Sequence, residues 1–110
     1  ILVGPGDEWE SIIESGQHDI ISFSPGKYVG RCGISISHNI TLKGVEGSSV
    51  TTIDCGNATR HLRLAGQIHV AIEGIAFVNG QVPTSDEGGG CVLAETAVQL
   101  EIRGSAFTAC

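Results

Sequence analysis

Four cysteines are the residues of this 110-residue chain with the clearest capacity for chemistry. They form no CxxC pair and have no histidine at metal-ligand spacing, so a zinc site has little support. Two disulfides are predicted instead, with four buried free thiols, which pack as small apolar groups, as the alternative. Disulfides would indicate an oxidising compartment. The cysteines are Cys32, Cys55, Cys91 and Cys110.

Two segments match the acceptor pattern for N-linked glycans, Asn39-Ile-Thr41 and Asn57-Ala-Thr59. Asn39 could instead be an ordinary turn residue that precedes a strand. Together with pairable cysteines, the two acceptor patterns predict an extracellular or cell-surface protein.

The carboxylates do not form a catalytic pattern. Asp54 is alone in its strand and is interpreted as a corner residue whose carboxylate binds backbone amides. Asp86 and Glu87, beside three glycines, are weak calcium candidates, because two acidic residues are few for a hard cation. The four histidines share no spacing. We therefore predict no catalytic residue, no resident metal and no cofactor, although an enzymatic role stays open.

Composition limits the class of protein. The net charge of −6 and the six scattered basic residues argue against a nucleic-acid partner. No run of eighteen apolar residues is present, so no membrane span is expected. Sixteen glycines and five aromatic residues suggest an aliphatic core with many tight corners. The length allows one domain, residues 1–110.

A thirty-residue repeat organises the chain. Residues 40–44, 70–74 and 100–104 (ITLKG, VAIEG and LEIRG) are near-copies that end at a glycine. Their apolar residues alternate with a period of two, which is typical of a β-strand. A fixed period of this size indicates units that bury their apolar sides by stacking on one another. Glu73 is expected to lie between Lys43 and Arg103, with opposite charges across neighbouring strands.

Short strands without helical segments between them fill the rest of the chain, which excludes a βαβ fold. About three strands per repeat predict a three-sided β-solenoid with residues 17–110 as its coils. The Pro-Gly segment 24–28 is expected to be a turn. Cysteine separations of 23 and 19 residues approach one coil, which would place Cys32 over Cys55 and Cys91 over Cys110.

Residues 1–16 are expected to form a strand, 1–3, and a capping helix. Asp7 is the predicted N-cap, in a capping box with Glu10, and Gly16 can end the helix. The apolar helix face would cover the end of the solenoid. Trp9 has an alternative role as a platform for sugar stacking, which is less favoured than packing. The residues of the predicted end cap are Asp7, Trp9, Ile12 and Ile13.

These features resemble the N-terminal part of the right-handed parallel β-helix, or pectin-lyase-like, superfamily. The resemblance rests on the cap, on DIISFSPGKY at 19–28, and on the glycine-punctuated strands NITLKG at 39–44 and VAIEGIAF at 70–77. It implies an all-β fold, a right-handed single-stranded parallel β-helix with a short N-terminal capping α-helix. GGGC at 88–91 and FTAC at 107–110 are also similar to the repeats of polymorphic outer-membrane-type surface proteins.

The expected function is that of a non-catalytic extracellular structural or surface module that could stack end to end into a filament. Its open C-terminal end is expected to meet another copy or a longer chain. Superfamily enzymes use clustered carboxylates, calcium and a late basic residue, a pattern that this chain lacks. The alternatives are an N-terminal fragment of a polysaccharide lyase or hydrolase, and a glycan-binding module.

Overall fold

The computed structural model describes residues 1–30, 33–56, 62–79, 92–94 and 97–108. Within these ranges the chain forms one short helix and twelve short strands. The elements are β1 (Leu2–Val3), α1 (Trp9–Glu14), β2 (Ile20–Phe23), β3 (Gly26–Val29), β4 (Ile34–Ile36), β5 (Ile40–Gly44), β6 (Thr51–Asp54), β7 (Leu62–Leu64), β8 (His69–Glu73), β9 (Ala76–Val78), β10 (Val92–Ala94), β11 (Gln99–Arg103) and β12 (Ala106–Thr108).

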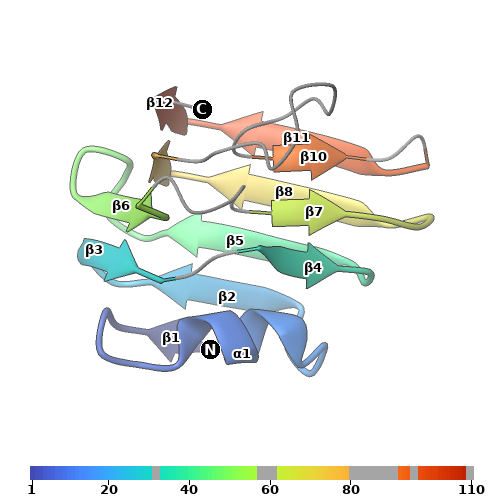
Figure 1. The fold of residues 1–110 in the computed structure, drawn as a ribbon, viewed down its shortest axis with the longest axis horizontal. Coiled ribbons are helices and arrows are strands. Elements are labelled where there is room, and N and C mark those ends of the chain that lie inside the picture. Colours follow the sequence, from blue (N-terminus) through green and yellow to red (C-terminus); the bar gives the residue numbers. More distant parts are fainter. Residues whose placement is uncertain (31–32, 57–61, 80–91, 95–96, 109–110) are drawn as a thin grey trace.

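The strands pair in parallel and form three small sheets. The first has five strands in the order β1-β2-β5-β8-β11, the second three in the order β10-β7-β4, and the third four in the order β12-β9-β6-β3. Each successive repeat adds one strand to each sheet, and β1 and β11 lie at opposite ends of the molecule (Figure 1).

The thirty-residue recurrence sets the pairing register, as predicted. Ile40 pairs with Val70, and Val70 pairs with Leu100. In the third sheet Phe77 likewise pairs with Phe107, and their rings stack with centroids 5.1 Å apart. Equivalent residues of successive repeats therefore lie beside one another.

The predicted fold class, a right-handed single-stranded parallel β-helix, is wrong. The strands belong to three separate sheets, and the described residues do not close them into a solenoid. The repeat specifies how equivalent strands pair, which separate parallel sheets satisfy, but it does not specify that the corners join into a continuous coil. The Pro-Gly segment also differs from the prediction, because Gly26–Val29 is a strand, β3, that pairs with β6.

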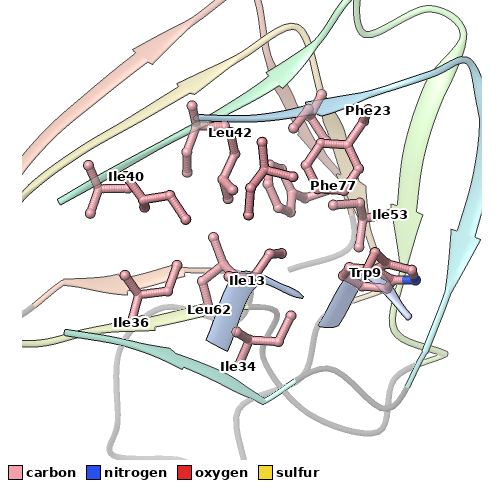
Figure 2. Packing of buried hydrophobic residues seen from close by; sticks show 14 of the residues in the cluster. Trp9, Ile13, Phe23, Ile34, Ile36, Ile40, Leu42, Ile53, Leu62 and Phe77 are labelled. Atoms are coloured by element: carbon pink, nitrogen blue, oxygen red, sulfur yellow. The ribbon is translucent and has the colours of Figure 1, made fainter. Parts of the chain in front are cut away.

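Aliphatic rows form the core. Alternation along each strand directs every second side chain inward, and the inward residues Ile21, Leu42 and Ile72, which are neighbours across the five-stranded sheet, are fully buried. Side chains from all three sheets point into this shared interior (Figure 2). The core is therefore built across the sheets.

Helix α1 closes one end of this core. Trp9 and Ile13 are buried, Ile12 is partly buried, and the helix packs against β4. Trp9 makes edge contacts with Phe23 and Tyr28, at centroid distances of 6.4 and 6.0 Å. Because its ring is enclosed, Trp9 offers no face for sugar stacking.

The prediction was wrong for the start of helix α1 and agrees with the structure at its end. The N-cap is Glu8 and makes no side-chain capping bond, so the predicted capping box of Asp7 and Glu10 is wrong. Asp7 instead accepts a hydrogen bond from the backbone N–H of Gly4, at 2.7 Å, and thereby fixes the turn that precedes the helix. At the other end Gly16 adopts a φ of 71°, which agrees with its predicted role in ending the helix.

Two repeat glycines are required by close backbone approach. A Cβ on Gly44 would collide with the carbonyl oxygen of Gly74. A Cβ on Gly74 would lie 2.7 Å from the carbonyl oxygen of Gly44, and Gly74 also has a φ of +64°. The thirty-residue glycine signal thus marks a place where neighbouring strands leave no room for side chains.

No helix in the described part of the chain is long and apolar enough to cross a membrane.

Candidate functional site

A hollow of about 470 Å³ lies on the outer face of the five-stranded sheet, and we call it the outer groove. Strand alternation builds it, because every second residue of β5, β8 and β11 faces away from the core. Thr41, Ala71 and Glu101 are neighbours across the sheet, and the small side chain of Ala71 leaves the space. The lining residues are Asp19, Ile20, Asn39, Ile40, Thr41, His69, Ala71, Glu73 and Glu101.

Several polar and charged side chains in and beside the outer groove contact one another. Nε2 of His69 lies 3.4 Å from Oε1 of Glu101, whose other oxygen lies 3.3 Å from Nη2 of Arg103. Nη1 of Arg103 lies 3.8 Å from Oε1 of Glu73, as predicted for the opposite charges of neighbouring repeats. Lys43 occupies the next position in the same row, beside Glu73. These side chains are substantially exposed, so each pair contributes about 0–1 kcal/mol.

The lining limits the chemistry of the outer groove. Carboxylates, one imidazole, one amide and one hydroxyl can hydrogen-bond a polar partner. Neither cysteine nor serine lines it, and no group of three or more metal-ligating side chains occurs among the described residues. The outer groove is therefore suited to weak polar binding.

Asn39 has a structural role at the edge of the outer groove. Its side chain is exposed, and Oδ1 accepts a hydrogen bond of 2.8 Å from the backbone N–H of His69, thirty residues later. This bond ties two repeats together and favours the interpretation of Asn39 as a turn residue. Asn57 lies outside the described residues, and glycan attachment at either asparagine stays a prediction.

Asp54 is the centre of a second polar cluster, at the corner after β6. Oδ1 accepts hydrogen bonds from the backbone N–H of Gly56, at 2.8 Å, and from Nδ2 of Asn79, at 3.1 Å. Nζ of Lys27 lies 3.3 Å from Oδ2. The Gly56 bond, followed by the Asn79 bond and the Lys27 ammonium, lowers the pKa of Asp54 below 3.8. The predicted corner role is confirmed, since one carboxylate connects three segments of the chain.

Of the four cysteines in the predicted disulfides, the described residues include Cys55. Cys55 is buried and disulfide-bonded. Cys32, Cys91 and Cys110 lie outside the described residues, so the pairing of Cys32 with Cys55 and of Cys91 with Cys110 stays a prediction. The calcium candidates Asp86 and Glu87 also lie outside them, as does His61.

Each sheet ends, on the side reached last by the chain, in a strand of the final repeats. We call these three edge strands, β10, β11 and β12, the open edge. Here residues that occupy core positions are exposed: Ile102 is 45% exposed and Phe107 38%, whereas their neighbours Ile72 and Phe77 are both 0% exposed. The open edge thus presents the cross-section of the core, next to strand edges that have no pairing partner among the described residues.

The outer groove was not predicted from the sequence. The repeat did contain a signal for its His69–Glu101 pair. When the three repeats are aligned, residues 39, 69 and 99 form one row and residues 41, 71 and 101 the row two positions on, so that His69 lies diagonally beside Glu101. The depth of the outer groove at Ala71 depends on how the surrounding side chains are arranged in space, which the sequence alone does not show.

Comparison with known proteins finds no matching family model, no matching curated protein and no matching solved structure.

Proposed function

We propose that this chain is a non-catalytic structural module that self-associates through its open edge. The observation that carries the proposal is the exposure of Ile102 and Phe107 at positions where the preceding repeat buries the same residue types completely. Exposed apolar side chains beside unpaired backbone groups favour the addition of another strand.

The polar sites support a structural role. The carboxylates of Asp54 and Glu101 are engaged by neighbouring donors, and Asn39 bonds the next repeat. These contacts hold repeats together, and none of them leaves a nucleophile beside a base. The charged rows on the outer face would keep that face in water.

We place this module outside the cell. The disulfide of Cys55 supports that location, as does the exposure of Asn39, whose bond to His69 uses Oδ1 and not the Nδ2 that a glycan would join. Mass spectrometry of the secreted protein under non-reducing conditions tests it, and unmodified asparagines together with four free thiols would contradict it.

Sedimentation velocity over a range of concentrations tests self-association. We expect the parent chain to form larger species as concentration rises, and Ile102→Lys to stay monomeric at concentrations at least about tenfold higher. Ile20→Lys is the matched control, because Ile20 is 55% exposed but lies on the outer face of β2 inside the sheet. A strictly monomeric parent chain, or equal effects of the two lysines, would contradict the proposal.

A further inference from the structure

We infer that the partner of the open edge is the β1 side of a second copy, so that β11 of one copy adds in parallel to β1 of the next. This inference rests on the proposed self-association and specifies its geometry. The five-stranded sheet would then continue through successive copies, because β11 and β1 are its two outermost strands.

One aliphatic row carries the geometry. Register places Ile1 beside Ile21, since Leu2 pairs with Ser22, and the row continues through Leu42 and Ile72 to Ile102. The middle members are fully buried, but the first and last, Ile1 and Ile102, are 51% and 45% exposed. Placing Ile102 of one copy beside Ile1 of the next would complete the row at both ends with a single contact.

The backbone groups at the two ends are complementary. Along this sheet, outward-facing residues bond back to the preceding strand: the N–H of Thr41 donates to Asp19, and the N–H of Gln99 donates to Ile68. In β1 the carbonyls of Ile1 and Val3 accept from β2, so the N–H and C=O of Leu2 point away from the sheet. The same alternation directs the backbone N–H and C=O groups of Leu100 and Ile102 away from β8.

This polarity predicts two specific bonds across the junction. The N–H of Leu2 would donate to the carbonyl of Ile102, and the N–H of Gly104 would donate to the carbonyl of Leu2. Pairing between two copies of β11 would leave Ile1 and Leu2 uncovered, whereas the parallel junction covers both ends.

Charge agrees with this register. A hollow of about 570 Å³ lies between β1 and α1, and its lining includes the apolar side chains of Leu2 and Ile12 and the carboxylates of Asp7 and Glu8. Arg103 is 69% exposed on its side chain and would lie beside Leu2, at the mouth of this acidic hollow. Helix α1 packs on β4, so the contact is concentrated on the five-stranded sheet.

Variants at Leu2 test the inference, because this side chain is 63% exposed and its N–H faces away from β2. Leu2→Pro removes the junction donor and keeps the carbonyls that bond β2. Leu2→Lys places a like charge beside Arg103, and Leu2→Glu places an opposite charge there. We expect Leu2→Pro and Leu2→Lys to weaken association at least about tenfold, and Leu2→Glu to retain it.

A mixing experiment tests whether β11 of one copy binds β1 of another. Ile102→Lys keeps an intact β1, and Leu2→Pro keeps an intact β11, so a mixture of these two variants should form heterodimers that grow no further. Sedimentation velocity with one variant fluorescently labelled measures this, and far-UV circular dichroism with Trp9 fluorescence verifies that each variant is folded.

The outcomes separate the two proposals. If Leu2→Pro and Leu2→Lys associate as the parent does while Ile102→Lys does not, the open edge is a self-association surface but β1 is not its partner, and the inference falls alone. A monomeric parent chain overturns both proposals. Leu2→Glu weakening association as much as Leu2→Lys would overturn the register that places Arg103 beside Leu2.

Discussion

The glycine column at Gly44, Gly74 and Gly104 predicts three different costs for the same substitution. A Cβ on Gly104 would meet nothing within 4 Å, but its φ is +54°, so alanine there adds backbone strain alone. Gly44 does not have a positive φ in the strained range, but its Cβ would collide with the carbonyl of Gly74. Gly74 combines both problems.

These differences set the expected magnitudes. The left-handed backbone costs an alanine about 1–2 kcal/mol, and the reduced entropy of the unfolded chain returns about 0.4–1, so Gly104→Ala should cost about 1 kcal/mol. At Gly74 the new Cβ would lie 2.7 Å from the Gly44 oxygen and 3.3 Å from the Gly47 Cα, both of them backbone atoms. Overpacking adds about 1–3 kcal/mol, so Gly74→Ala should cost about 2–4 kcal/mol.

Urea unfolding, followed by far-UV circular dichroism and by the fluorescence of Trp9, measures the free energies of unfolding. Coincident transitions with the two probes would justify a two-state treatment. Gly16→Ala is a further control for strain, because Gly16 has a φ of +71° and its Cβ would make only an ordinary contact, 3.8 Å from Nδ1 of His38. If Gly44→Ala and Gly74→Ala cost no more than Gly104→Ala, close strand approach is not the reason for the glycines.

Two further predictions concern buried or partly buried oxygens. Because the pKa of Asp54 is lowered in the folded state, its stabilising contribution is present above its ordinary value of 3.8 and is lost as pH falls through the folded pKa. The stability difference between the parent and Asp54→Asn, from urea unfolding, should therefore shrink from about pH 5 to about pH 2, and a constant difference would contradict this. Thr51 is fully buried, and its Oγ1 has no hydrogen-bond partner among the described residues. Thr51→Val should therefore raise the free energy of unfolding by about 1 kcal/mol. Thr52→Val is the control, because Thr52 is half-buried and its replacement should change the free energy of unfolding little. If Thr51→Val were destabilised, the hydroxyl of Thr51 would have a hydrogen-bond partner.

Local pattern was sufficient for the repeated strands β5, β8 and β11 and their register, although it missed strand β3 at the Pro-Gly segment. Alternation identified the inward residues of β5, β8 and β11, and the period of thirty residues identified their partners. Both features depend on neighbours along one strand or on a fixed repeat. The closed solenoid was wrong because closure depends on the corners between sheets, where the sequence offers glycines and short polar clusters compatible with several paths.

The candidate sites divide in the same way. The role of Asp54 could be predicted because a carboxylate two residues before Gly56 can reach its N–H. Its contacts with Lys27 and Asn79 come from other strands and had no local signal. For the helix, Trp9 and Ile13 followed from helical spacing, but the N-cap did not, because Asp7 forms its bond with the preceding turn.

The energetics of the open edge decide what kind of assembly to expect. Full burial of one isoleucine side chain is worth about 1.5–3 kcal/mol, and Ile102 and Ile1 are each about half exposed, so covering both returns about 2 kcal/mol. Association costs at least about 4 kcal/mol of lost rotation and translation. The two side chains cannot hold two copies together alone. The complementary backbone groups of Leu2 and Ile102 and the apolar surface of β1 must contribute, so association should be weak, dependent on concentration, and sensitive to changes on both sides of the junction.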